Sequence, residues 1–219
     1  MNRTTLRRTG AAGAAVFALS FGLAACGDDP DSTASASETT SSSSAPMETE
    51  SSEAAGGAGA ETFGEGCSAI PTSGKGSFDG MVTDPVATAA SNNPLLATLV
   101  AAATEAQLVD TLNGAEGLTV FAPTNDAFAK LPEKDLKAVL ADKELLTAIL
   151  THHVVGEQLD PTAVVGEHDS LNGDKVTVEG DTESGMTVDS GTATVVCGNI
   201  PTANATVYVI DTVLMPAGM

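Results

Sequence analysis

The residues best suited to chemistry are three histidines with carboxylates close to them in the sequence. They are His152, His153 and His168, with Glu157, Glu167 and Asp169 nearby. Their number suffices for a metal ion, but they lack the i, i+4 helical or short-loop spacing that is typical of a metal site. Adjacent strand residues point to opposite faces, so His152 and His153 would not share an ion in an extended segment. Without a GxSxG turn or a glycine-rich phosphate loop, the sequence predicts no catalytic, cofactor-binding or metal-binding residues.

Cys26 lies where a lipid is attached in exported bacterial proteins. Residues 1–25 have a basic head and an apolar run too short to span a bilayer, which is typical of an export signal peptide. The run ends in Leu-Ala-Ala-Cys-Gly, which resembles the lipobox of bacterial lipoproteins and implies cleavage before Cys26 and a diacylglycerol thioether on it. The alternative is a non-lipidated secretory signal with an incidental cysteine. Both interpretations place the folded part outside the cytoplasm.

Residues 26–65 contain mainly Ser, Thr, Ala, Gly and acids, with few large apolar side chains. Such a segment buries too little apolar surface to offset the entropy of ordering, so we expect a disordered acidic tether. A coil of about 36 residues has an end-to-end distance on the order of 30–35 Å. The tether would hold a domain formed by residues 66–219 away from the membrane.

Cys67 and Cys197 are the remaining cysteines, and two thiols in an exported domain normally pair. The sequence therefore predicts a disulfide between the start of the domain and its last hairpin. The chain-entropy model gives about 5 kcal/mol as an upper value for closing such a loop. The alternative, a redox-active or metal-binding pair, lacks the CxxC spacing.

The net charge argues against nucleic acid as a partner. The formal charge is −20, and without residues 1–25, which carry all three arginines, 6 lysines against 29 acids give −23. Such a surface repels phosphate. The sequence has no tryptophan and one tyrosine, so a platform for stacking bases or sugars is not expected either. The Asn-x-Thr matches at Asn2 and Asn204 carry no information, because one lies in the export signal and the other in a predicted strand.

The stretch Leu118–Leu131 predicts a strand, a tight corner and a helix. Its first residues are β-branched or large and apolar, and a proline then stops the run. Thr124 is a good N-cap, and Asn125 and Asp126 lie in the first turn, where they can satisfy free N–H groups and complement the helix dipole. We expect these three residues to be structural, although a polar corner of this kind could also bind a ligand.

The remaining pattern favours an α+β fold, with helices in the first half and strands in the second. Helical spacing predicts two short helices in 91–112, with a break near Thr104, and further helices over 132–140 and 142–150. In residues 151–156 the apolar spacing changes from that of a helix to that of an extended segment. From residue 174 onward, four runs of alternating apolar residues separated by Gly-, Asp- and Asn-rich turns predict strands.

Two motifs at a characteristic separation resemble the fasciclin (FAS1) domain family. They read TVFAPTNDAFAKLP and LLTAILTHHVVGEQLDP, and the chain closes with NATVYVIDTVLMP. The resemblance covers 67–219, and within the family it is greatest to actinobacterial and mycobacterial cell-surface lipoprotein antigens. It implies a β-sandwich or wedge flanked by helices, and a role in adhesion without catalysis. His153 matches the family's buried, structural histidine. His152 replaces the usual tyrosine, and we expect it to be the more exposed of the two and a candidate partner contact.

These expectations combine into a lipoprotein on the extracytoplasmic face of the cell membrane, acting in adhesion or surface interaction. Its partners would be the membrane, through the lipid on Cys26, and an unidentified surface protein, matrix or carbohydrate, but not nucleic acid. Shedding or secretion is left open. The alternative is a cell-envelope protein that binds a small apolar ligand or lipid. A sizeable apolar cavity would favour ligand binding, and a closed core would favour contact with a partner.

Overall fold

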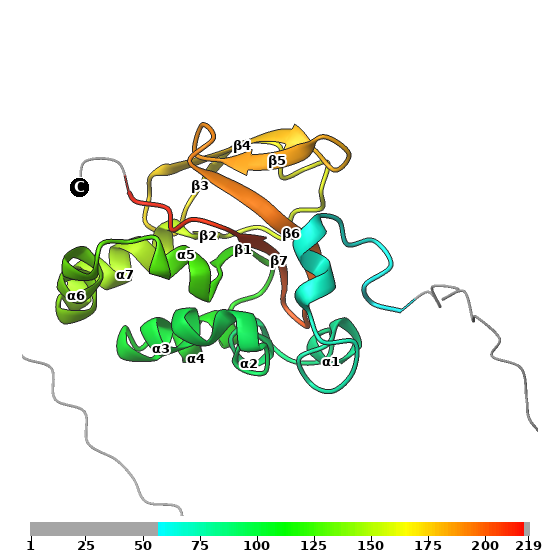
Figure 1. Cartoon of the computed structure of the whole chain (residues 1–219), viewed down its shortest axis with the longest axis horizontal. Helices are drawn as coiled ribbons and strands as arrows, with labels where there is room; N and C mark the ends of the chain where they lie inside the picture. The colour runs from blue at the N-terminus through cyan, green and yellow to red at the C-terminus, as the bar shows by residue number, and fades with distance from the viewer. Residues whose placement is uncertain (1–56, 217–219) are drawn as a thin grey trace, which may run out of the picture. The chain divides into compact units, whose positions relative to one another are not determined.

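The computed structural model describes residues 57–216, except the side chain of Asp135. The expected signal peptide and most of the expected tether, including Cys26, lie outside these residues. Helices occupy the first half of the described chain (Figure 1). The α-helices are α1 (Phe78–Met81), α2 (Val86–Ser91), α3 (Ala97–Glu105), α4 (Val109–Gly114), α5 (Asn125–Ala129), α6 (Glu133–Ala141) and α7 (Lys143–His152), and the 3-10 helices are η1 (Glu65–Ala69) and η2 (Pro94–Leu96). None of the described helices is long and apolar enough to cross a bilayer.

Seven strands form one sheet in the order β2-β1-β7-β6-β5-β4-β3. Their bounds are β1 (Leu118–Pro123), β2 (Val154–Val155), β3 (Gly166–Asp169), β4 (Lys175–Asp181), β5 (Gly185–Val188), β6 (Ala193–Pro201) and β7 (Ala205–Ile210). β1 and β7 pair in parallel, and the other neighbours are antiparallel. All residues of β1 and β7 are buried, as expected for strands covered on both faces.

The sheet curls so that its two edge strands meet. Val155 at the end of β2 forms an isolated bridge with Ser170, directly after β3. Side chains from β1, β2 and β4–β7 fill the space inside the curl. This inner cluster comprises Phe121, Val155, Leu159, Val164, Val176, Val178, Met186, Val188, Ala193, Val195, Tyr208, Ile210 and Leu214. The expected α+β fold, in which a β-sandwich or wedge is flanked by short helices, is thereby confirmed, and its β part is one curled seven-stranded sheet.

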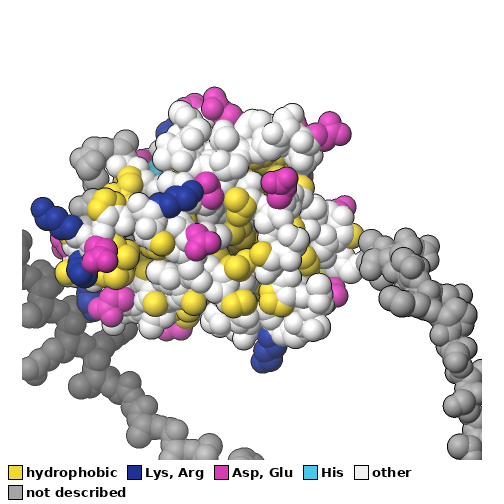
Figure 2. Space-filling view, in the orientation of Figure 1, with side chains coloured by type: hydrophobic (Ala, Val, Ile, Leu, Met, Phe, Trp, Pro, Cys, Tyr) yellow, Lys and Arg dark blue, Asp and Glu magenta, His cyan; other side chains and the backbone are white. Residues whose placement is uncertain are grey.

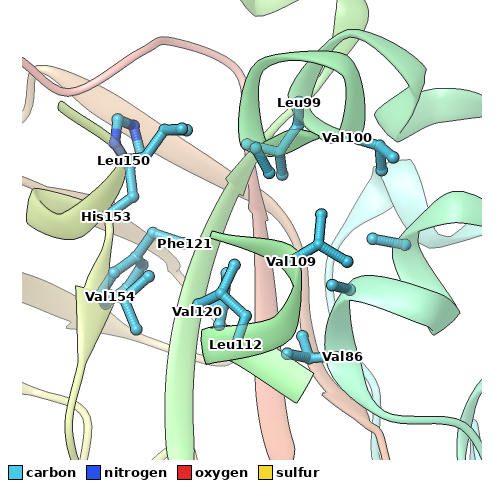
Figure 3. A pocket seen from close by; sticks show the side chains of 13 residues that line it. Val86, Leu99, Val100, Val109, Leu112, Val120, Phe121, Leu150, His153 and Val154 are labelled. Carbon is cyan, nitrogen blue, oxygen red and sulfur yellow. The ribbon is translucent and has the colours of Figure 1, made fainter. Parts of the chain in front are cut away.

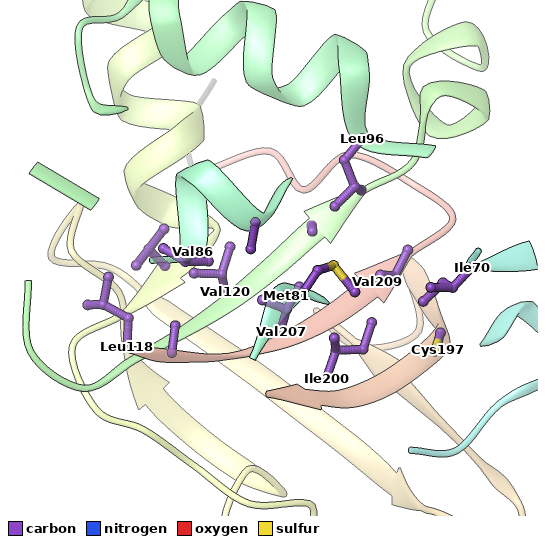
Figure 4. Packing of buried hydrophobic residues seen from close by; sticks show 14 residues of the cluster. Ile70, Met81, Val86, Leu96, Leu118, Val120, Cys197, Ile200, Val207 and Val209 are labelled. Atoms are coloured by element: carbon purple, nitrogen blue, oxygen red, sulfur yellow. The ribbon is translucent and has the colours of Figure 1, made fainter. Parts of the chain in front are cut away.

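The helices cover the outer face of the β1–β7–β6 part of the sheet. Residues of α1, α2 and η2 pack on Leu118, Val120, Val207 and Val209 (Figure 4). A third cluster joins α3, α5, α6 and α7 around Phe128. These helices are short, so tertiary packing of their apolar faces stabilises them more than helix propensity does.

Several boundaries differ from the sequence-based expectation. The domain begins before residue 66, because Phe63 exchanges two backbone hydrogen bonds with Gly198 of β6, at 3.3 and 2.8 Å. The predicted helices of 91–112 correspond to η2, α3 and α4, and the break falls around Gln107, which has a φ of 58°. The helix expected to end at residue 150 continues to His152, so the extended segment that follows is only β2. α1, α2 and β3 were not predicted.

Candidate functional site

The polar corner after β1 fastens two helices to each other. Thr124 Oγ1 accepts a hydrogen bond from Ala127 N–H at 3.1 Å and caps α5. Asn125 Oδ1 accepts from Thr98 N–H at 2.9 Å, and its Nδ2 donates to the Pro94 carbonyl at 2.8 Å. The amide of Asn125 is thus used within the fold, at the start of α3.

Asp126 is exposed in the first turn of α5, where its negative charge complements the helix dipole. It borders an open hollow of about 380 Å³, together with Lys130 and Asp211. Lys130 Nζ and Asp211 Oδ2 form an ion pair at 2.8 Å. The hollow therefore has a neutralised charge pair at its edge and no histidine or serine in its lining that could act as a base or nucleophile.

His153 joins the end of α7 to the segment after β7. Its Nδ1–H donates to the Ile149 carbonyl at 2.8 Å, and its Nε2 accepts from Leu214 N–H at 2.9 Å. These partners assign the tautomer, with the proton on Nδ1. The side chain is 2% exposed, and burial lowers its pKa to about 4. His153 is therefore a neutral residue of the core at physiological pH.

The expectation that His152 is the more exposed histidine is wrong. It is also 2% exposed, because α7 continues through it and directs its ring inward. Its Nδ1 lies 2.8 Å from Asp174 Oδ1, and its Nε2 lies 3.0 Å from Asp189 Oδ2. We call these three residues the His152 clamp. A direct contact between the His152 ring and a partner would require this buried group to move.

The clamp favours a charged ring. Burial acts to lower the pKa of His152, but the hydrogen bonds to Asp189 and Asp174 outweigh burial and raise it. Burial likewise acts to raise the pKa of Asp174, but hydrogen bonds from Ser170, His152 and Asn172 hold it at about 2. An imidazolium between two carboxylates is the arrangement in which both ring nitrogens donate.

A serine, a histidine and two aspartates meet here, but not in the order that hydrolysis needs. A nucleophilic serine must give its proton to the histidine, whereas Ser170 Oγ donates to Asp174 and both nitrogens of His152 face carboxylates. His168 lies apart on β3, with Nε2 at 2.9 Å from the Val164 carbonyl. The described residues contain no group of three or more ligating side chains that could hold a metal ion.

Comparison with known proteins assigns the family. The model of the fasciclin domain matches residues 94–216. The chain belongs to the fasciclin domain family. The cell surface glycolipoprotein MPT83 of Mycobacterium tuberculosis is 49% identical over 165 residues, covering 72% of this chain and 73% of that protein. The immunogenic protein MPB70 of Mycobacterium bovis is 50% identical over 168 residues, covering 73% and 84%. Protein sll1483 of a Synechocystis strain is 39% identical over 130 residues, covering 58% and 71%. Fasciclin surface antigens form a non-enzymatic family.

The predicted disulfide of this fasciclin domain is confirmed. Cys67 in η1 and Cys197 in β6 are bonded, with their Cα atoms 4.8 Å apart. Beside this link, Phe63 pairs with Gly198. The first turn of the domain is therefore bound both covalently and by backbone hydrogen bonds to a strand inside the sheet.

Three important residues of the fasciclin domain were not identified from the sequence. Asp174 and Asp189 lie 22 and 37 residues after His152, and nothing local marks them as its partners. Asn204 lies in the β6–β7 turn, not in a strand. Its Oδ1 accepts from Val86 N–H at 2.9 Å, and its Nδ2 donates to the Leu112 and Ala115 carbonyls at 2.9 and 2.8 Å. The only local signal for Asn204 was its position among turn-forming residues.

An apolar cavity lies between the helices and β1 of the fasciclin domain (Figure 3). It has a volume of about 40 Å³, and its lining comes from α2, α3, α4, β1, the end of α7 with His153, and β2. A single water needs roughly 10–15 Å³, whereas pockets for drug-sized ligands measure roughly 300 Å³ or more. The cavity has room for a few atoms, so an acyl chain or a ring system would fit only after the helices moved.

Proposed function

We propose that this protein is lipid-anchored through Cys26 on the extracytoplasmic face of the membrane and acts there as a module for adhesion or surface interaction. The observation that carries the proposal is the 49% identity, over 72% of the chain, to a protein described as a cell surface glycolipoprotein. The lipobox-like sequence before Cys26 and the disulfide support it, because both belong to exported proteins.

The arrangement of the polar residues favours contact through the surface. Asn125, His152 and His153 bond within the domain, and the apolar cavity is small. Lysines, acids and apolar side chains are interspersed over one face of the domain (Figure 2). A surface of this kind suits a protein or matrix partner better than a small apolar ligand. Two acyl chains would retain such a module at the membrane, since each buried CH₂ contributes about 0.8 kcal/mol.

The Cys26→Ser variant should lose its attachment to the membrane. Without the thiol no thioether can form, so we expect the protein in the medium or as an uncleaved precursor, and the wild type in the detergent-soluble membrane fraction with added lipid mass. Fractionation and mass spectrometry of both proteins measure this. Ser32→Ala is the control, because it changes one small side chain close to Cys26 and leaves both the Cys26 thiol and the Cys67–Cys197 disulfide intact. Equal membrane retention of Cys26→Ser and wild type, with no lipid mass on either, would contradict the anchor.

A partner should be detected by crosslinking on intact cells. Leu171 is a candidate anchor of the contact, because it is 47% exposed on a turn that the His152 clamp holds in place. We expect Leu171→Ser to reduce the yield of crosslinked product about fivefold, equivalent to about 1 kcal/mol of contact energy.

Leu140→Ser is the control for this experiment, because Leu140 is 39% exposed but lies on α6. Its yield should stay close to that of the wild type. If both variants crosslink like the wild type, Leu171 is not part of the contact. If the wild type gives no product at all, the interaction role itself fails.

A further inference from the structure

The two edges of the sheet meet at a seam formed by Val154–Val155 on one side and 170–174 on the other. Few backbone bonds cross it. Val155 and Ser170 form one isolated bridge, and Leu171 N–H donates to the Val154 carbonyl at 2.8 Å. In contrast, β1 pairs with β7 along its whole length. Side chains therefore contribute a larger share of what holds the seam closed.

His152 supplies a side-chain contact across the seam. It precedes β2, and its Nδ1 reaches Asp174 at the end of the opposite turn, while its Nε2 reaches Asp189 in the β5–β6 turn. Only an imidazolium carries a proton on both nitrogens. A neutral ring turns a lone pair toward one of the two carboxylates, which converts an attractive contact into a repulsive one. A single proton on the ring thus determines whether His152 binds both the turn 170–174 and the β5–β6 turn.

We propose that the His152 clamp is a proton-dependent latch, which holds the seam closed while the ring is charged and loosens it when one proton leaves. The direction of the pH dependence follows from the hydrogen bonds that the His152 ring makes to both carboxylates. Because these bonds outweigh burial and raise the pKa of His152, the latch is closed at low pH and opens as the pH rises through that pKa. This inference concerns the fold alone and holds wherever the protein is anchored.

The contact to Asp174 is the one that opens. Asp174 keeps a donor in Ser170 and a second in Asn172, whose Nδ2 lies 3.0 Å away. Asp189 has a long hydrogen bond, at 3.4 Å, from Thr177 N–H. Losing the Nε2 donor would leave the partly buried Asp189 carboxylate with this long bond alone, whereas Asp174 keeps two side-chain donors, so the remaining proton stays on Nε2, facing Asp189. The turn 170–174 is then held to β2 by its backbone bonds.

The charged and titratable groups that face the His152 ring come from three elements. They are Asp174 before β4, Asp189 after β5, and His153 after α7, with its ring centroid 6.3 Å away. His153 takes no part in the switch, because burial lowers its pKa to about 4 and it is already neutral where His152 titrates. The latch therefore responds to one proton.

Nuclear magnetic resonance of the full chain tests the latch directly, because the protein has three histidines whose ring signals can be assigned. We expect the His152 ring to carry two protons at about pH 5.5 and one, on Nε2, at about pH 9.5. Over the same titration the protection factor of the Leu171 amide against hydrogen exchange should fall about tenfold, after correction for the intrinsic pH dependence of exchange. The reason is that the charge-assisted bond from His152 Nδ1 to Asp174 is lost. The Thr202 amide, bonded to Ala205 in the β6–β7 turn, is the internal reference.

Two variants complete the test. Asp174→Asn should show low protection of Leu171 at both pH values, whereas Glu179→Gln, which removes one exposed negative charge from β4, should keep the wild-type response. The proposal is overturned if protection of Leu171 does not follow the His152 titration, if the neutral ring keeps its proton on Nδ1, if the ring stays doubly protonated to about pH 10, or if Asp174→Asn behaves like the wild type.

Discussion

Replacing both Cys67 and Cys197 with alanine is expected to lower the free energy of unfolding by up to about 5 kcal/mol, the upper value of the chain-entropy model for this loop. The bond links residues separated by 130 positions, so it removes many conformations of the unfolded chain. Small domains are stable by roughly 5–15 kcal/mol, so the loss is a large part of the total. Urea unfolding of the wild type and the double variant measures the difference.

The reduced wild type is the control for the alanine substitutions. Reduction breaks the same bond but keeps both sulfur atoms in place, including that of Cys197, which is buried in β6. If the reduced protein and the double variant lose the same free energy of unfolding, the loss is due to the cross-link. A larger loss in the variant would show that the cavity left by the missing sulfur atoms also contributes. A decrease of less than about 1 kcal/mol in both would show that the cross-link contributes little, contrary to this prediction.

The Asn204→Asp substitution should destabilise the domain by about 3 kcal/mol, although it replaces only the side-chain NH₂ group with an oxygen. The Nδ2 of Asn204 donates to the Leu112 and Ala115 carbonyls, so an aspartate would place a carboxylate oxygen against carbonyl oxygens. The β6–β7 turn would then lose its bonds to the end of α4. Thermal and urea unfolding monitored by circular dichroism would measure the loss.

Asn199→Asp is the matched control, because it makes the same chemical change at a residue whose Nδ2 donates to one carbonyl, that of Glu61, at 3.0 Å. We expect a loss of about 1 kcal/mol there. Equal losses at both positions would mean that the added negative charge, in an already acidic protein, dominates over the hydrogen bonds. That result would contradict the role assigned to Asn204.

Local chemistry made part of the fold predictable. The corner at Thr124 is determined by residues next to each other in the sequence: an apolar strand, a proline and a capping hydroxyl. The disulfide was predictable because the sequence carries a predicted export signal and, with Cys26 assigned to the lipobox, two cysteines were left to pair. The two fasciclin motifs then gave the architecture that neither feature could supply.

The clamp and the sheet topology depend on contacts between distant residues, and the sequence does not show them. The parallel pairing of β1 with β7 joins Leu118 to Ala205. The burial of His152 depends on α7 continuing past Leu150 and on Asp174 and Asp189 being brought to its ring. α2 was missed because its sequence, VATAAS, has few large apolar residues, and its position comes from packing on the sheet.

The link between Cys67 and Cys197 also determines how the domain bears force. If the protein is anchored through Cys26 as proposed, the domain would be pulled at its N-terminal side whenever a bound partner moved away from the membrane. Tension entering at residue 57 passes Phe63, which is paired with Gly198, and reaches the covalent bond at Cys67. From there it is transferred to β6, a strand paired with β7 inside the sheet. The helices from α1 to α7 follow Cys67 in the chain, so they are shielded from a pull that would otherwise unravel them first.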